Sequence, residues 1–349
     1  MINNSFFSTE ILRWFRENGR DLPWRETKDP YAIWLSEIIL QQTRIVQGWE
    51  YWERFMQTYP KVEDLAAASE DDVLKLWQGL GYYSRARNLH AAAKQIVALG
   101  SFPNTLDGIK SLKGVGDYTA AAIGSFAFDI PAAVVDGNVY RVLSRYFGID
   151  TPINSTQGKK EFAALAQSLL PASDAASYNQ GMMDFGAIQC TPQSPKCLLC
   201  PLAETCEALR CGRVEELPVK NKTVKVKTRH LSYIYIRCKS SVADGAENTE
   251  PMIAIHRRGE GDIWQGLWEP YNVSDVKELP SFVKNPILLA KDVKHVLTHR
   301  ILLADFYLLE TETCPQLPDD YIWIKESEIE DYGVPRLIEI MLEKINPAE

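Results

Sequence analysis

The chain has 349 residues, of which 46% are hydrophobic and 24% are charged, and its formal net charge is −8. A single hydrophobic core seldom supports this length, so we expect two or three domains. The proportions are those of a globular protein, and the sequence has no run of eighteen apolar residues, which argues against a membrane-spanning helix.

The acidic charge is unevenly distributed along the chain. Residues 1–230 carry 26 Lys/Arg and 25 Asp/Glu, whereas residues 231–349 carry 12 and 21. The first part can therefore still present a basic face to phosphate, and the net charge does not exclude DNA as a partner. The first twenty residues have no basic stretch followed by an apolar one, so we expect no secretory signal. We expect a reducing cytoplasm, in which the seven cysteines form no disulfide framework.

The first two hundred residues are predicted to be helical. Apolar residues recur at helical spacing, and Gly and Pro separate the segments. The predicted helices are residues 8–17, 31–55, 70–77, 84–99, 118–128, 139–147, 156–169 and 175–188. No strand-like alternation of useful length interrupts them, so this region is predicted to be all-α.

The pattern changes near Gly212. Residues 213–230 are rich in Lys and Arg and lack helical periodicity, which is typical of a linker. Beyond them, β-branched and aromatic runs predict strands at 232–237, 252–256, 301–309 and 321–324, with a polar hairpin loop at 241–250 and a closing helix at 335–345. The second region, residues 231–349, is therefore predicted to be α+β.

Four cysteines lie close together near the end of the helical region. Their spacing is C-x6-C-x2-C-x5-C, formed by Cys190, Cys197, Cys200 and Cys206. Zinc also takes four thiolates, but zinc sites usually pair their cysteines as two short knuckles, and this spacing contains only one. We therefore favour an iron–sulfur cluster over zinc. Cys238 and Cys314 are expected to be ordinary strand or loop residues.

Residues 105–128 contain two glycines around one apolar residue, Gly114, Val115 and Gly116, between two predicted helices. Such a hairpin turns sharply, and the amides at the start of the second helix can bind a phosphate. A plain helix–helix turn is the alternative. Asp136 follows in an apolar run just before another helix, where it is either a helix N-cap or a functional carboxylate.

These features together resemble a known family. Helix, G-V-G hairpin, helix, Asp136 and the four-cysteine cluster are similar to the helix–hairpin–helix DNA glycosylases that hold an iron–sulfur cluster, and most closely to the adenine DNA glycosylase (MutY) family. The similarity runs over nearly all of residues 1–215 and includes Leu22-Pro23-Trp24-Arg25, Trp34-Leu35-Ser36-Glu37, Leu40-Gln41-Gln42-Thr43 and Gly79-Leu80-Gly81-Tyr82-Tyr83. It implies a six-helix core at about 24–131, a cluster lobe made of 1–23 and 132–212, and one 4Fe–4S cluster.

The resemblance implies removal of adenine opposite 8-oxoguanine or guanine by base flipping, in base excision repair. Breaking an N-glycosidic bond requires a proton for the leaving base and a carboxylate near the sugar cation. Glu37 lies on an apolar helix face, where burial raises a carboxyl pKa as a general acid requires, although a salt-bridged core glutamate is the alternative. By resemblance Glu37 protonates the adenine, Asp136 stabilises the sugar cation or captures it covalently, and Tyr118 and Asn138 position the sugar and Asp136.

Tyr118 sets the expected subclass. In related lyases a lysine at this position forms a Schiff base with the sugar. A phenol forms no imine, so the chain is expected to leave an abasic site. The resemblance further implies an adenine pocket and a wedge that enters the base stack. The pocket would comprise Trp24, Arg25 and Asp184, and the wedge Gln42 and Tyr82.

The C-terminal region resembles a Nudix domain through Gly266-Leu267-Trp268-Glu269-Pro270. The catalytic Nudix pattern is missing from residues 271–295, so we expect a reader of 8-oxoguanine in double-stranded DNA and no hydrolase. The family's H-x-F-S-H type loop corresponds to His295-Val296-Leu297-Thr298-His299. By resemblance Leu297, Thr298 and His299 meet the damaged base, with Leu297 in place of an aromatic residue. Nothing in the sequence signals oligomerisation, and we expect a monomer.

Overall fold

The computed structural model describes residues 4–221, 226–239, 250–274 and 279–345. The chain forms two compact units, Met1–Ala66 with Ala91–Lys222 and Ala67–His90 with Thr223–Glu349. Residues 67–90, predicted within the helical region, thus group with the C-terminal segment. The division into a helical region at 1–212, a linker at 213–230 and a reader domain at 231–349 stays a prediction.

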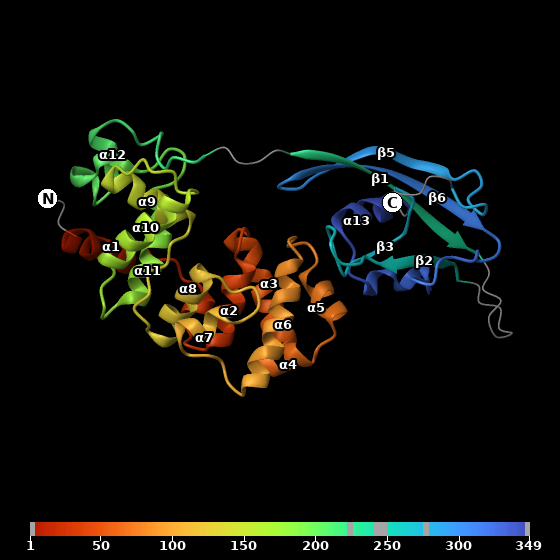
Figure 1. Ribbon diagram of the computed structural model, residues 1–349, viewed down its shortest axis with the longest axis horizontal. Helices are drawn as coiled ribbons and strands as arrows, with labels where there is room; N and C mark the ends of the chain where they lie inside the picture. Colours follow the sequence, from red (N-terminus) through yellow and green to blue (C-terminus); the bar gives the residue numbers. More distant parts are fainter. Residues whose placement is uncertain (1–3, 222–225, 240–249, 275–278, 346–349) are drawn as a thin grey trace. The chain divides into compact units, whose positions relative to one another are not determined.

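The N-terminal part is all-α, as predicted. Within residues 4–221 the structure contains helices and no strand. The helices, labelled in Figure 1, are α1 Asn4–Asn18, α2 Pro30–Ile39, α3 Ile45–Thr58, α4 Val62–Ala67, α5 Glu70–Trp77, α6 Ser84–Leu99, α7 Leu106–Lys110, α8 Asp117–Phe128, α9 Gly137–Phe147, α10 Thr156–Leu169, α11 Ala175–Asp184 and α12 Glu207–Arg210. Single turns of other helix types lie at Pro23–Arg25, Phe185–Gln189, Cys197–Leu199 and Ala203–Thr205.

One predicted helix is divided in the structure. The apolar pattern over residues 31–55 predicts a single helix, but α2 ends at Ile39 and α3 begins at Ile45. Gln42, in the connection, has a φ of 59°, which a continuing helix cannot accommodate. No Gly or Pro marks this break, so its signal in the sequence is weak.

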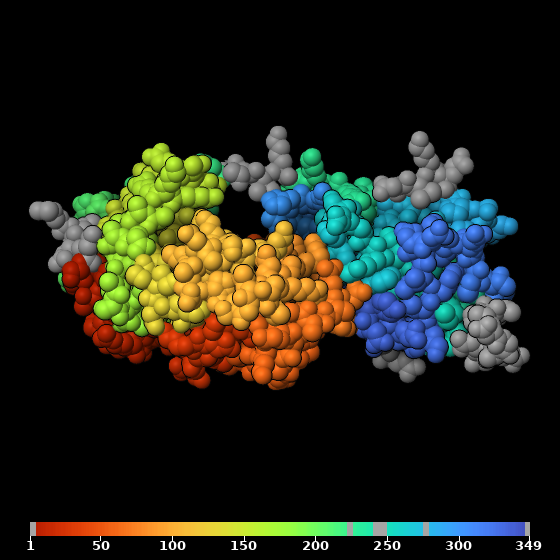
Figure 2. All heavy atoms as spheres, turned by 60° about the horizontal axis from the view of Figure 1, so that its bottom comes forward, coloured from red at the N-terminus to blue at the C-terminus, as the bar shows by residue number. Residues whose placement is uncertain are grey.

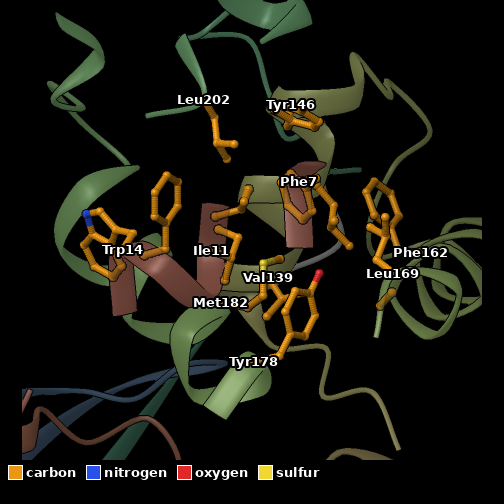
Figure 3. Packing of buried hydrophobic residues seen from close by; sticks show 14 of the residues in the cluster. Phe7, Ile11, Trp14, Val139, Tyr146, Phe162, Leu169, Tyr178, Met182 and Leu202 are labelled. Atoms are coloured by element: carbon orange, nitrogen blue, oxygen red, sulfur yellow. The ribbon is translucent and has the colours of Figure 1, made fainter. Parts of the chain in front are cut away.

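A hydrophobic core joins the N-terminal helix to the helices around Asp136. Figure 3 shows Phe7, Ile11 and Trp14 of α1 packed against side chains of α9, α10 and α11. Trp14 meets the ring of Phe185 edge-on, with centroids 5.0 Å apart. This packing fixes α9, and therefore the residue at its start, relative to α11.

A second contact places the predicted hairpin. α7 and α8 pack against each other. In the space-filling view their atoms belong to one unbroken area of the surface, coloured yellow-orange (Figure 2). α8 also packs against α2, which carries Glu37. The hairpin and the predicted acid are therefore held by the same group of helices.

The C-terminal part contains a mixed sheet of seven strands with a helix on one face (Figure 1). The strand order is β3-β2-β1-β6-β5, with β4 paired to β1 and β7 paired to β2. β1 and β6 run parallel, and β5 and β6 antiparallel. The bounds are β1 Lys227–Cys238, β2 Met252–Arg257, β3 Trp268–Glu269, β4 Tyr271–Asn272, β5 Ile287–Val296, β6 Arg300–Thr311, β7 Tyr321–Lys325 and α13 Arg336–Ile345.

The two faces of the sheet have separate cores. Alternate residues of β1, including Leu231 and Tyr233, pack with Leu337 and Met341 of α13. Their neighbours Ile234 and Ile236 face the other side. The alternation explains why the sequence predicts this strand from its β-branched and aromatic residues.

Three sequence expectations need correction or fall outside the described residues. β1 begins at Lys227, so residues 227–230 of the predicted linker are strand. Cys238 and Cys314, expected to be ordinary residues, are joined by a disulfide with Cα atoms 5.2 Å apart, because β1 and β6 pair in parallel up to Cys238 and Thr311. Linker residues 222–225 and loop residues 241–249 lie outside the described part.

Among the helices in the described part of the chain, none has the length and hydropathy needed to cross a membrane.

Candidate active site and cluster site

Glu37 lies in the last turn of α2, inside the protein. Asp29 caps this helix by accepting a hydrogen bond of 3.0 Å from the amide of Tyr31, and Pro30 begins it. The nine residues from Tyr31 to Ile39 are all buried, so the helix is enclosed on every side. Glu37 is 7% exposed and therefore holds its carboxyl in an apolar environment.

Tyr118 and Asp136 both act on this carboxyl, Tyr118 through a hydrogen bond and Asp136 through its charge. The Tyr118 hydroxyl donates a hydrogen bond of 3.0 Å to Oε2 of Glu37. Burial and the Asp136 charge raise the pKa of Glu37 to about 7, against the lowering effects of this hydrogen bond and of Arg25. Glu37 is therefore half protonated near neutral pH, and no cation pairs with it directly among the ion pairs of the described residues.

Asp136 is the N-cap of α9, so the capping interpretation holds. Its Oδ1 accepts hydrogen bonds from the amides of Asn138 and Val139, at 2.9 and 2.8 Å. Its Oδ2 accepts one of 2.7 Å from Nδ2 of Asn138. Burial raises the pKa of Asp136 despite these hydrogen bonds. A capping role and a chemical role are compatible, because the cap fixes the orientation of the carboxylate.

The side chain of Asn138 is in turn held by Arg141. Arg141 donates hydrogen bonds of 2.8 Å to Oδ1 of Asn138 and 2.7 Å to the carbonyl oxygen of Gly186. Its Nε donates a further hydrogen bond of 2.8 Å to the carbonyl oxygen of Cys190. A Cβ atom at Gly186 would lie 2.5 Å from Cβ of Asn138, so only glycine fits there. One arginine therefore connects the Asp136 cap to a predicted cluster cysteine, a link that sequence reasoning missed.

The predicted adenine pocket contains a buried ion pair. Asp184 is 0% exposed, and both its oxygens accept hydrogen bonds of 2.8 Å from the guanidinium of Arg25. Arg20 adds hydrogen bonds of 2.9 Å from its amide and from Nε. Burial alone would raise the pKa of Asp184, but the hydrogen bonds from the two arginines hold it below its ordinary value. Asp184 thus positions Arg25, and Arg20 is an anchor that sequence reasoning missed.

Trp24 lies beside Arg25 in the same turn. Its indole meets Trp49 and Trp52 edge-on, with ring centroids 5.9 and 5.7 Å apart. These aromatic contacts and the Asp184 ion pair fix both side chains that the sequence assigns to the base pocket.

The hairpin has the geometry that the sequence predicts. Gly114 has a φ of 78°, a conformation that favours glycine. Val115 is buried and anchors the turn, and Gly116 is the N-cap of α8. A Cβ at Gly116 would have no neighbour within 4 Å, so the helix start is open. Amides at such a helix start can bind an anion such as a phosphate.

Both predicted wedge residues stand at strained turns. Gln42 and Tyr82 have φ values of 59° and 47°, which are uncommon for residues other than glycine. Gln42 is exposed, and Tyr82 is 47% exposed although its ring is large and apolar. Such strain is often kept at functional positions. The Tyr82 side chain is also held in place, because its hydroxyl is hydrogen-bonded to the hydroxyl of Thr298.

The four clustered cysteines line one cavity of about 30 Å³ together with Arg145. Arg145 donates to Sγ of Cys190 at 3.5 Å, and burial raises the pKa of the Cys200 thiol to about 12. In the described residues no three His, Cys, Asp or Glu side chains are placed to hold a single metal ion. Four cysteines lining one site are the ligand set of an iron–sulfur cluster, which Cys190, Cys197, Cys200 and Cys206 would hold.

The predicted reader loop is a tight turn between β5 and β6. Backbone hydrogen bonds of 2.8 and 3.4 Å link Leu297 and Arg300 in both directions. Thr298 and His299 between them are exposed, whereas Leu297 packs against the core under the sheet. The Thr298 hydroxyl is hydrogen-bonded to the hydroxyl of Tyr82, so the predicted reader turn lies against a predicted wedge residue. Leu297 anchors the turn, and His299 is exposed beside it.

Comparison with known proteins agrees with this architecture. Residues 35–171 match the HhH-GPD superfamily base excision DNA repair protein, residues 190–206 match the iron–sulfur binding domain of endonuclease III, and residues 246–344 match the NUDIX domain. The solved structure of a thermostable thymine-DNA glycosylase is 34% identical, with a TM-score of 0.56 over 60% of this chain and 97% of that one. Fold and site thus define a base excision DNA glycosylase with a 4Fe–4S cluster, a hydrolase of N-glycosyl bonds.

Two proteins of similar sequence identify the family within this class. An adenine DNA glycosylase of Buchnera aphidicola subsp. Schizaphis graminum is 31% identical over 350 residues, which cover 97% of this chain and 98% of that protein. An adenine DNA glycosylase of Mus musculus is 42% identical over 226 residues, 61% of this chain and 44% of that protein. The chain belongs to the adenine DNA glycosylase family, and the expected fold class, enzyme class and cofactor are confirmed.

Proposed function

We propose that this enzyme removes adenine mispaired with 8-oxoguanine or guanine and leaves the DNA backbone intact. The observation that carries the proposal is the Glu37 carboxyl, which is buried, bound by Tyr118 and has a pKa of about 7. A group poised near neutral pH is suited to deliver a proton to a leaving base. Membership of the family supports adenine as the base that is removed, and the geometry of the site supports Glu37 as the acid.

The reaction assigns a separate role to each carboxyl group. Glu37 donates its proton to a ring nitrogen of adenine, and the glycosidic bonding pair leaves with the base. Asp136, ionised and oriented by its cap hydrogen bonds, stabilises the positive charge that develops on the sugar. Water then adds to the sugar carbon and gives its proton to the Glu37 carboxylate, which restores the acid. The products are free adenine and an abasic site.

Tyr118 determines what happens to the abasic site. Its hydroxyl hydrogen-bonds to Glu37 and cannot form an imine with the sugar. In the described structure no lysine ion pair or hydrogen bond involves Glu37 or Asp136. We therefore propose a monofunctional glycosylase, whose product breaks only when alkali is added.

The adenine must leave the helix to reach a buried acid. We propose that Gln42 and Tyr82 fill the gap in the stack, that Gly114, Val115 and Gly116 bind a phosphate, and that Trp24 and Arg25 receive the base. The exposure of Gln42 and Tyr82 supports the wedge, and the open space at Gly116, where α8 starts, supports the phosphate contact. Asp184 acts on the base only through Arg25, since the two arginines occupy its oxygens.

The C-terminal domain, residues 231–349, is proposed to read the base opposite the adenine. Thr298 and His299 are exposed at the β5–β6 turn and can hydrogen-bond to 8-oxoguanine, while Leu297 holds the turn on its core. We further propose that the protein acts as a monomer on DNA in the cytoplasm.

Adenine excision is tested with four duplexes carrying A·8-oxoG, A·G, A·T and T·G. Under single turnover we expect cleavage of the adenine strand after alkali, fastest opposite 8-oxoguanine, and none without alkali. A·T controls for specificity. T·G is included because a similar solved structure is a thymine-DNA glycosylase. Excision of thymine but not adenine would overturn the proposal, and cleavage without alkali would overturn its monofunctional part.

The excision rate is expected to depend on pH in a bell shape. Glu37 acts in its protonated form, so the rate falls as pH rises through about 7. Asp136 acts ionised, so the rate also falls in acid, beginning above the ordinary pKa of aspartate because burial raises the pKa of Asp136. Single-turnover rates on the A·8-oxoG duplex, measured between about pH 5 and about pH 9, check this. A rate that increases steadily through neutral pH would contradict the acid role.

A further inference from the structure

The end of the sheet that carries the reader turn is basic, although the rest of the C-terminal region is acidic. Residues 226–230 and 293–300, VKTRH and VKHVLTHR, contain four Lys/Arg, three His and no Asp or Glu. Over residues 231–349 the count is 12 Lys/Arg against 21 Asp/Glu. Cations are therefore concentrated where β1 begins and where β5 turns into β6.

Strand pairing brings the two segments together (Figure 1). In the parallel β1–β6 ladder Lys227 is opposite Arg300, and the Lys227 amide donates a hydrogen bond of 3.2 Å to the carbonyl oxygen of His299. Across β5–β6, Lys294 pairs with Leu303, so it points to the face opposite that of Arg300. Lys227 and Lys294 are both exposed, and they stand on opposite faces of the sheet beside the turn.

The arginines near the turn are already engaged. Asp262 accepts hydrogen bonds from Arg229 at 2.6 Å, from Arg258 at 2.8 Å and from Arg300 at 3.3 Å. Through these hydrogen bonds the Asp262 carboxylate holds Arg229 near the start of β1 and Arg300 at the start of β6. Across the described part of the chain, by contrast, Lys227 and Lys294 take part in no ion pair.

We infer that Lys227 and Lys294 bind phosphates of the DNA strand read by the turn, one on either side of Thr298 and His299. The inference rests on the proposed function, since it requires the turn to face a nucleotide. Lysine is a flexible point charge, suited to phosphate oxygens whose direction varies. Contacts to the DNA phosphates on either side would fix the position of a turn that otherwise touches the base through only two side chains. Because the domain is acidic, it can bind DNA only where its positively charged residues are concentrated.

The test compares two charge-matched double variants of the full chain. Lys227→Gln/Lys294→Gln removes the pair beside the turn. Lys284→Gln/Lys344→Gln removes two exposed lysines away from it, one before β5 begins and one in the last turn of α13. The probe is a duplex with 8-oxoguanine opposite 2′-fluoro-2′-deoxyadenosine, which resists excision. Its affinity is measured between about 50 and about 300 mM salt.

We expect the Lys227/Lys294 variant to bind about 10- to 100-fold more weakly near 0.1 M salt, with a salt slope reduced by about 1.8. Lys227→Arg/Lys294→Arg should restore both the affinity and the salt slope. A slope equal to that of the Lys284/Lys344 variant overturns the inference while wild-type adenine excision keeps the proposed function. Absence of adenine excision by the wild type overturns the proposed function itself.

Discussion

Replacing Glu37 by glutamine is expected to slow adenine excision by about 10²- to 10⁴-fold, the range typical of a lost general acid. The amide has the shape of the carboxyl and can still accept the hydrogen bond from Tyr118, but it has no proton of suitable acidity to donate. Binding to the A·8-oxoG duplex should persist. Single-turnover kinetics and an affinity measurement check the two parts, with Glu50→Gln on the exposed face of α3 as the control.

The same variant separates an acid from a structural glutamate. In the folded protein the pKa of Glu37 is about 7, against an ordinary value of 4.5. The wild type therefore loses stability as pH rises from 4.5 to 7, by up to about 3 kcal/mol. Glu37→Gln should be the more stable protein above pH 7 and lose that advantage in acid. A variant that is less stable at every pH would instead indicate a salt-bridged core residue.

Replacing Asp136 by asparagine should slow excision by at least about 100-fold, since the variant loses the carboxylate that we propose to stabilise the sugar cation. Asparagine caps helices as well as aspartate does, so α9 and the fold should survive. The measurement is the single-turnover rate together with the thermal midpoint. Excision close to wild type in Asp136→Asn would mean that Asp136 only caps α9.

Asp136→Ala provides the matching control for this variant. It removes the cap and the charge together, so it should lose about 1 kcal/mol of stability as well as activity. The difference between the two variants isolates the cap, which the sequence alone could not separate from the chemistry.

Sequence patterns predict most of the helical region because its segments end in recognisable signals. α5, α6 and α10 have the bounds predicted for them, with Ser69 and Ser155 as caps before two of the three. The break at Gln42 escaped prediction because a strained residue, and no Gly or Pro, ends α2. The sequence pattern therefore fails at a position where we place a functional wedge.

The sheet was less predictable than the helices. β5 was missed because its burial does not alternate, and its register against β6 shifts near Ala290. The disulfide between Cys238 and Cys314 joins residues 76 apart, and only the parallel pairing of β1 with β6 brings them close. Strand pairing over such distances is not visible in local periodicity.

Within the site, motif residues could be predicted but the residues that hold them could not. The Tyr118 hydroxyl hydrogen-bonds to Glu37, and the Asp136 charge acts on the same carboxyl, while the roles that the resemblance implies for these residues stay predictions. Arg20 and Arg141 carry no motif of their own, and each acts on a residue far away in sequence, Asp184 and Cys190. Such supporting contacts follow from the fold and not from spacing.

The buried ion pair of Asp184 limits when the N-terminal turn can fold while the chain is being synthesised. Arg25 emerges from the ribosome 159 residues before the carboxylate that receives it. The N-terminal turn with Arg20 and Arg25 can form its ion pairs only after α11 has been synthesised, so the turn that we propose to receive the base is not complete before then. A nascent chain that stops before Asp184 therefore lacks the carboxylate that both guanidinium groups require.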